Sequence, residues 1–134
     1  MRECLVDTDI LSYYFKGEEA VIQNFRKYSE KFSFINLSLI TYYEILSGLR
    51  FKNSNKILNN FIQFSRENNI IPLTIKSVNF SSIIYSELRK SGQALADADI
   101  LIAGIALENN LTLVTNNVRH FSKIKGLIID NWKK

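Results

Sequence analysis

The sequence predicts an α/β sandwich with a central, mostly parallel β-sheet. Short apolar runs alternate along the chain with longer segments of helical spacing, and this alternation is typical of parallel strands joined by helices. Pro72 is the only proline, which suits a chain dominated by helices. A length of 134 residues with 46% hydrophobic residues is sufficient for one domain with a sizeable core.

The predicted elements alternate from the first residues to the last. In chain order we expect a strand over 2–6, helices over 8–15 and 19–28, a strand over 32–38, helices over 39–50 and 54–68, a strand over 70–74, helices over 76–91 and 97–110, a strand over 111–115, a helical turn over 118–124 and a last strand over 127–130.

Local signals support each helix in turn. Gly17 is a stop signal for the first helix, and the second has acids at its start and bases at its end, as the helix dipole favours. Ser38 is a good N-cap for the third. Apolar residues in the fourth lie at positions 57, 58, 61, 62 and 64, and Gly92 ends the fifth. The sixth is apolar nearly all round, so we expect it to be buried.

Composition excludes several classes of protein. The single Cys4 rules out an internal disulfide and suits a reducing compartment. No apolar stretch is long enough to predict a membrane span, and charges interrupt the first nine residues, unlike a signal peptide. We therefore predict a cytoplasmic protein.

Acidic and amide side chains stand at positions that a fold alone does not require. Asp7 follows the first strand, Asp97 and Asp99 begin a buried helix, and residues 115–117 follow the strand over 111–115. Parallel strands place ligand sites at their carboxyl ends, so these groups are expected to meet. Glu44 lies in an apolar helix and shares one face with Thr41 and Gly48.

Several carboxylates brought together repel unless a cation joins them or some are protonated. Oxygen ligands favour Mg²⁺ or Mn²⁺, whereas one His and one Cys are too few for zinc. Five of the 13 acidic residues are expected to cluster, namely Asp7, Asp9, Glu44, Asp97 and Asp99. The rest of the chain then has eight acidic residues against 17 Lys and Arg. A basic body around an acidic site suits a polyanion, and the predicted chemistry is phosphodiester hydrolysis.

Simpler structural roles compete at each position. Asp9 and Asp97 are candidates to cap or begin their helices. Glu44 is a candidate for an ion pair with Lys or Arg. Asp7 and Asp99 are candidates for ordinary turn residues. His120 is expected on the surface. The tyrosines are expected to pack on helix faces, and these are Tyr13, Tyr14, Tyr42 and Tyr43.

Three stretches resemble a known family. They are LVDTDILSYYF near the start, SLITYYEILSGL near one third of the chain and DADILIAGIALENNLTLVTNNVRHFSKIKGLIIDNW at the end. Together they resemble the PIN-domain toxins of the VapC class, over essentially all of residues 1–134 as a single domain. The last stretch is the most specific.

The resemblance implies a PIN-like three-layer α/β/α sandwich and an endoribonuclease that depends on Mg²⁺, with Mn²⁺ as a substitute. Its metal-binding and catalytic acids are Asp7, Glu44 and Asp99. It also implies cleavage of structured RNA such as tRNA or rRNA, a homodimer, and a VapB-like antitoxin that occupies the active-site groove and makes the DNA contacts.

This sequence departs from the family pattern at one point. A fourth acid is common in the family where this chain has Asn117. The sequence therefore leaves open whether the site binds one metal ion or two. Asp97 is a candidate to supply the missing charge. Thr8, Thr41 and Ser38 are candidates to orient a ligand or the phosphate.

Basic residues that follow the last site segment are the expected RNA contacts, namely Arg119, Lys123 and Lys125. Two alternatives stay open. One is a PIN domain that binds RNA or a protein without cleaving. The other is a phosphatase of the haloacid dehalogenase type, in which Asp7 forms a phospho-aspartate.

Overall fold

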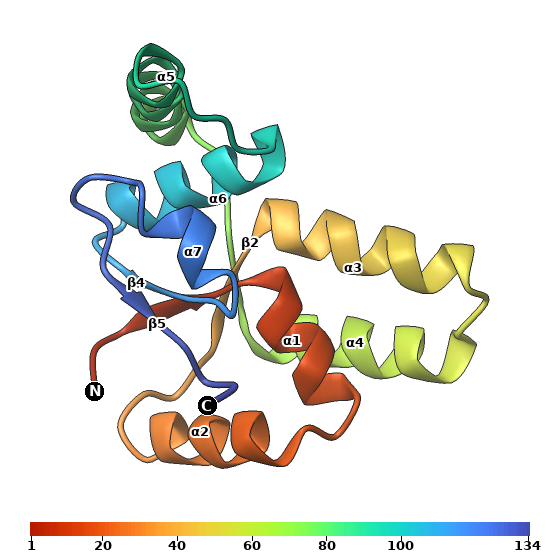
Figure 1. The fold of residues 1–134 in the computed structure, drawn as a ribbon. Helices are drawn as coiled ribbons and strands as arrows, with labels where there is room; N and C mark the ends of the chain where they lie inside the picture. The colour runs from red at the N-terminus through yellow and green to blue at the C-terminus, as the bar shows by residue number, and fades with distance from the viewer.

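The computed structural model describes all 134 residues, which form five strands and seven helices (Figure 1). The strands are β1 Cys4–Val6, β2 Asn36–Ser38, β3 Asn69–Ile71, β4 Thr112–Val114 and β5 Ile129–Asp130. The helices are α1 Thr8–Phe15, α2 Glu19–Ser29, α3 Leu39–Phe51, α4 Asn55–Glu67, α5 Ile75–Lys90, α6 Asp97–Glu108 and α7 Val118–Phe121.

The strands form one sheet in the order β3-β2-β1-β4-β5, and every neighbouring pair is parallel. The central pair aligns Val6 with Val114, so β1 and β4 end side by side. The predicted central sheet is confirmed, and its carboxyl ends bring residues 7 and 115 to one edge.

Each face of the sheet has its own hydrophobic core, because successive strand residues point to opposite faces. Cys4 and Val6 join α1, α2, α3 and α4 in one core, which also contains the buried Trp132. Leu5 and Leu113 join α5, α6 and α7 in the other. The sheet is thus the middle of three layers.

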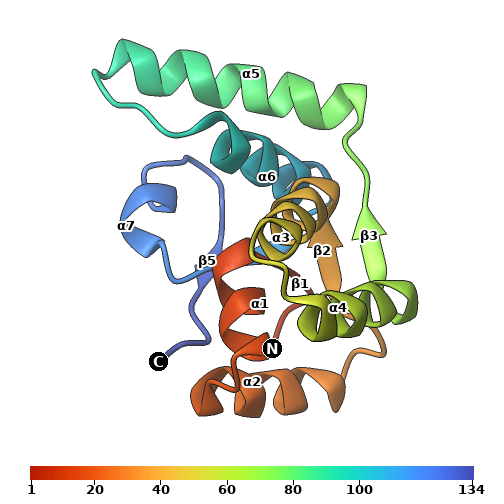
Figure 2. The same cartoon turned by 90° about the vertical axis from the view of Figure 1, so that its right-hand side faces the viewer.

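The helices divide accordingly in the two ribbon views. α5 and α6 lie above the sheet and α2 lies below it in both (Figures 1 and 2). α3 and α4 pack against each other and extend away from the sheet as a helical hairpin (Figure 1). α1 and α3 both begin near the carboxyl ends of the strands, which places their first turns beside the expected site.

All five strands are shorter in the structure than the sequence predicts, and the physical reason is visible for two of them. Within the predicted strand over 32–38, the Ile35 N–H donates to the side chain of Asn68 (2.8 Å), so regular strand pairing begins only at Asn36. The strand predicted over 70–74 ends at Ile71. Pro72 has no N–H for the ladder, and Thr74 instead caps α5.

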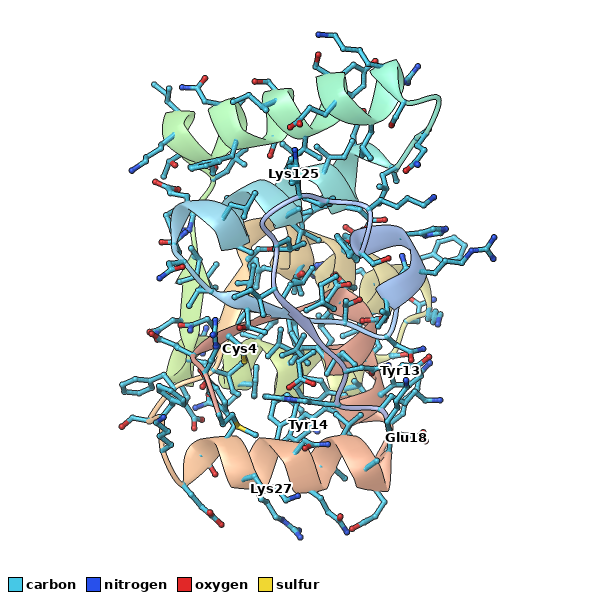
Figure 3. The ribbon with its side chains drawn as sticks, turned by 60° about the vertical axis from the view of Figure 1, so that its left-hand side comes forward. Cys4, Tyr13, Tyr14, Glu18, Lys27 and Lys125 are labelled. Carbon is cyan, nitrogen blue, oxygen red and sulfur yellow. The ribbon has the colours of Figure 1, made fainter.

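The tyrosines behave differently from one another. Tyr14 stacks on Phe25 with ring centroids 4.1 Å apart, and Tyr42 packs against the same core, as expected. Tyr43 is 69% exposed, so its predicted packing is wrong: it points to solvent on the outer side of α3. Figure 3 shows Tyr14 on the sheet side of α2, whereas Lys27 on that helix points outward.

No helix combines the length and the apolar character that a membrane span requires.

Candidate active site

Asp7 occupies the junction between β1, α1 and β4. Its N–H donates to the Val114 carbonyl (2.9 Å), which continues the ladder by one residue. One carboxylate oxygen, Oδ1, accepts from the Thr8 N–H (2.8 Å), so Asp7 is the N-cap of α1. The other, Oδ2, accepts from the Thr115 hydroxyl (2.8 Å). The side chain is therefore fixed by the first residue of α1 and by the residue that follows β4.

Burial raises the pKa of Asp7 to about 7, and the charge of Asp9 adds to this effect. The hydrogen bonds from Thr115 and Thr8 lower the pKa, while the charge of Asp99 raises it further. Asp7 as a residue is only 5% exposed. A cation bound nearby would offset both the burial of the Asp7 carboxylate and its repulsion by Asp9 and Asp99.

Asp9 connects α1 to the loop after β4. Its Oδ1 accepts from the Ile10 N–H (2.7 Å) and its Oδ2 accepts from the Asn116 N–H (3.0 Å). Burial raises its pKa and these backbone hydrogen bonds lower it. Asp9 lies in the first turn of α1, as predicted, but the cap itself is Asp7, because Asp7 is the last extended residue before the helix.

Glu44 faces the site from α3. Its Oε1 accepts from the Thr8 hydroxyl (2.6 Å), and the hydroxyls of Thr8 and Thr41 are 3.0 Å apart. Ser38 caps α3 by accepting from the Thr41 N–H (3.0 Å), as the sequence predicts. The competing role for Glu44, an ion pair with Lys or Arg, is not the contact that forms: its partner is the hydroxyl of Thr8, which ties α1 to α3.

Asp99 lies in the first turn of α6 and is half-buried. Burial raises its pKa, the charges of Glu44 and Asp9 raise it further, and His120 lowers it. The structure therefore places Asp7, Asp9, Glu44 and Asp99 within one electrostatic neighbourhood, with His120 at its margin.

Other predicted residues lie outside this group. Asp97 is not the cap of its helix: Ala96 holds that position, and Asp97 is the exposed first residue of α6. Asn117 stands before α7 without a side-chain cap, and its N–H donates to the Thr115 hydroxyl (3.0 Å). Arg119 is exposed on α7 beside His120, which is also exposed as predicted.

Lys123 and Lys125 line a hollow of about 220 Å³ against α5, together with Glu87. Figure 3 shows Lys125 in the loop after α7, towards α5. The structure does not bring these two lysines to the carboxylates.

Thr115 was not among the predicted site residues, although the segment from 115 to 117 was noted. Its hydroxyl accepts from Asn117 and donates to Asp7, so it orders both sides of the junction. The feature of the sequence that could have identified Thr115 is its hydroxyl at the carboxyl end of a predicted buried strand.

The donor set fits a hard divalent cation, since every group around Asp7 offers oxygen. No three His, Cys, Asp or Glu side chains are arranged to hold an ion together. Mg²⁺ is commonly bound through one or two carboxylates with water completing its shell, and that mode suits the pair Asp7 and Asp99.

Fold and site together define a PIN-type nuclease, and comparisons with known proteins agree. The model of the PIN domain family matches residues 4–127. Ribonuclease VapC1 of Methanocaldococcus jannaschii is 32% identical over 90% of this chain and 80% of its own. Ribonuclease VapC2 of Rickettsia felis is 29% identical over 97% and 98%. The chain therefore belongs to the PIN domain family and, within it, to the VapC ribonucleases.

Two further relatives bear on function. The structure of VapBC2 from Rickettsia felis bound to a DNA fragment from its promoter superposes with a TM-score of 0.87. It is 28% identical and covers 96% of this chain and 97% of that one. The tRNA(fMet)-specific endonuclease VapC of Shigella flexneri is 23% identical over 98% and 99%. The PIN fold accounts for the two acids after β1, so the phosphatase alternative has no support.

Proposed function

We propose that this single PIN domain is the toxin of a toxin–antitoxin pair, a metal-dependent endoribonuclease that hydrolyses phosphodiester bonds in structured RNA. The observation that carries the proposal is the state of Asp7. A carboxyl fixed by hydrogen bonds at the end of β1, with a pKa of about 7 and the charges of Asp9 and Asp99 acting on it, is suited to a divalent cation.

Asp7 and Asp99 are the proposed holders of Mg²⁺, for which Mn²⁺ substitutes. A bound divalent ion supplies an activated water and neutralises charge on the phosphate. Glu44 uses Oε1 to accept from Thr8, so Oε2 remains to accept a hydrogen bond from the attacking water. Hydrolysis then joins the water oxygen to phosphorus and releases the 3′ oxygen as a hydroxyl, which leaves a 5′-phosphate on the other product.

The proposed supporting residues act through those three acids. Thr8 and Thr41 orient Glu44, and Ser38 fixes the first turn of α3 that presents it. Asp9 holds the loop after β4 through Asn116. Asn117 is the candidate for a contact through water at the edge of the site. Asp97, the exposed first residue of α6, is left outside the proposed site.

The proposed substrate is tRNA or rRNA. The Shigella relative is named for a tRNA, and the basic body of this chain suits a polyanion. Arg119, next to His120 on α7, is the proposed phosphate contact nearest to Asp99. Lys123 and Lys125 are proposed as more distant contacts.

The proposed partner is a VapB-like antitoxin, because the Rickettsia structure is a VapBC2 complex on promoter DNA. We propose that such an antitoxin contacts the DNA and that this chain forms a homodimer. Co-expression with the antitoxin, followed by size-exclusion chromatography with light scattering, measures the toxin–antitoxin complex and the homodimer.

A cleavage assay tests the nuclease. Purified protein is incubated with total tRNA and rRNA in Mg²⁺, in Mn²⁺ and in EDTA, beside Asp7→Asn and Asp99→Asn. We expect discrete cuts that need metal and disappear in both variants. Asp97→Asn is the matched control for acid removal on α6, and retained cutting is expected there.

A binding-only PIN domain is the second candidate, favoured by Asn117 and by the absence of a preformed three-ligand group. RNA binding without cuts in excess Mn²⁺, from folded protein free of antitoxin, would establish it instead.

A further inference from the structure

A groove opens directly beside Glu44, between α1, α3 and α4. Its volume is about 150 Å³, and Thr8 and Glu44 line it along the side that faces the candidate active site. None of the other main hollows of the molecule includes any of the four clustered carboxylates. The groove is therefore a continuation of the site along α3.

The wall of the groove is mostly apolar, and its rim is cationic. Side chains of α1, α3 and α4 form the wall, among them Ile45, Leu49 and Ile57. Lys16 at the end of α1 and Lys52 at the end of α3 are exposed at the rim. Apolar walls between cations suit a flat, uncharged ring carried on an anionic chain.

Gly48 gives the groove its room. It follows Glu44 by one helical turn, and a Cβ built at this position meets no other atom within 4 Å. A glycine in a helix interior costs roughly 1 kcal/mol relative to alanine, and nothing in the packing of α3 requires it. The open space at Gly48 belongs to the groove.

We propose that this groove is a nucleobase subsite of the ribonuclease. It receives the unstacked base of the nucleotide next to the scissile phosphate, while Lys16 and Lys52 hold the neighbouring backbone phosphates. The inference rests on the proposed function: with the reacting phosphate at Asp7 and Asp99, the adjoining nucleotide lies over the adjoining surface. Sequence-specific RNA recognition relies on such splayed bases.

Filling the groove tests the proposal. Gly48→Leu adds a side chain inside it, and Ser47→Leu adds the same side chain one residue earlier, where the helix is exposed and does not line the groove. Both are made in an Asp7→Asn background, so RNA is bound without being cut. Circular dichroism and thermal melting establish folding. Gly48→Gln is the second filling variant if Gly48→Leu does not fold.

The probes are two fluorescent oligoribonucleotides of equal length, one of mixed sequence and one with abasic sugars at every position. Binding is followed by anisotropy in EDTA. We expect the background protein and Ser47→Leu to bind the base-bearing chain about tenfold more tightly than the abasic one. Gly48→Leu should remove that preference, and Lys16→Gln with Lys52→Gln should weaken both probes equally and reduce the salt dependence.

The outcomes separate this inference from the function on which it rests. Equal base preference in Gly48→Leu and Ser47→Leu overturns the subsite and leaves a groove for a protein segment. Loss of the preference only in Gly48→Leu supports it, even if the unmutated protein cuts no RNA. In versions of Gly48→Leu and Ser47→Leu that keep Asp7, equal metal-dependent cleavage of total tRNA overturns the subsite while the nuclease stands.

Discussion

At the scale of single residues, Asp7 couples the chemistry of the site to the stability of the fold. Folding raises its pKa from 3.8 to about 7. Between these two values the folded state keeps a proton that the unfolded state has lost, so the free energy of unfolding falls as the pH rises through this window. Below it both states are protonated, and above it neither is.

We therefore predict that, in EDTA, the unmutated protein loses stability between about pH 4 and pH 7, by at most on the order of 4 kcal/mol. Asp7→Asn keeps the N-cap, because Asn caps as well as Asp. It should remove the largest part of this slope, leaving the smaller part due to Asp9 and Asp99, and be the more stable protein at pH 8. Urea unfolding across the pH range measures it. Asp97→Asn, an exposed control, should follow the unmutated curve, and a parallel curve for Asp7→Asn would contradict the prediction.

Thr8 is predicted to act by holding Glu44. A hydroxyl has one proton, and Thr8 gives it to Glu44 at 2.6 Å, so Thr41 donates in the Thr8–Thr41 pair. Thr8→Val removes both interactions at nearly constant volume. We expect RNA cleavage to fall by about 10- to 100-fold, as for other residues that orient a metal-site carboxylate, and Thr8→Ser to restore it. A Thr8→Ser variant as inactive as Thr8→Val would indicate a packing role instead.

The sequence predicts which acids lie near one another better than it predicts the hydrogen bonds that hold them. Asp7 and Asp99 were expected together because they follow parallel strands or begin a buried helix, and Glu44 because it interrupts an apolar face. The hydrogen bond from Thr115 to Asp7 depends on two side-chain conformations across neighbouring strands. No spacing within one segment encodes such a contact.

At the scale of elements, the packing of α5 on α6 depends on Gly104. A Cβ at this position would collide with the Ser81 Oγ and lie 2.5 Å from the Ser77 carbonyl oxygen. The Ser81 hydroxyl is itself committed, since it donates to the Ile100 carbonyl (2.9 Å). The two helices therefore approach each other through a glycine and two serines.

Gly104→Ala is predicted to push α5 and α6 apart and to destabilise the protein by about 1–3 kcal/mol, the usual cost of overpacking. Gly48→Ala is the matched control. Its Cβ meets open space, so the better helix propensity of alanine should raise stability by roughly 0.5–1 kcal/mol. Chemical denaturation of both variants measures the contrast, and a neutral Gly104→Ala would show that α5 shifts without cost.

Helix bounds were predicted more closely than strand bounds for a physical reason. α1 begins and ends where its caps and Gly17 indicate, and Gly17 adopts a φ of +85° just after it. A strand ends where its partner stops offering hydrogen bonds, and that depends on residues distant in sequence. The Asn68 side chain at Ile35 is one such case.

At the scale of the whole molecule, the two cores fix the site from opposite sides. Asp7, Asp9 and Glu44 stand on α1 and α3, which pack in one core, and Asp99 stands on α6 in the other. The sheet edge is where these layers meet. A cation shared by Asp7 and Asp99 would therefore join the two layers, and its binding would stabilise the whole fold.

This linkage gives a prediction that needs no RNA. At pH 8, Mn²⁺ or Mg²⁺ should raise the melting temperature of the unmutated protein, and EDTA should reverse the rise. An ion at 100 times its Kd stabilises the folded state by about 2.7 kcal/mol. The rise should be lost in both Asp7→Asn and Asp99→Asn, which remove one proposed ligand from each layer, and should persist in Asp97→Asn. Differential scanning calorimetry measures it. A rise of equal size in all four proteins would mean that the ion binds elsewhere, whereas its loss in Asp7→Asn alone would remove Asp99 from the metal site and leave the ion within one layer.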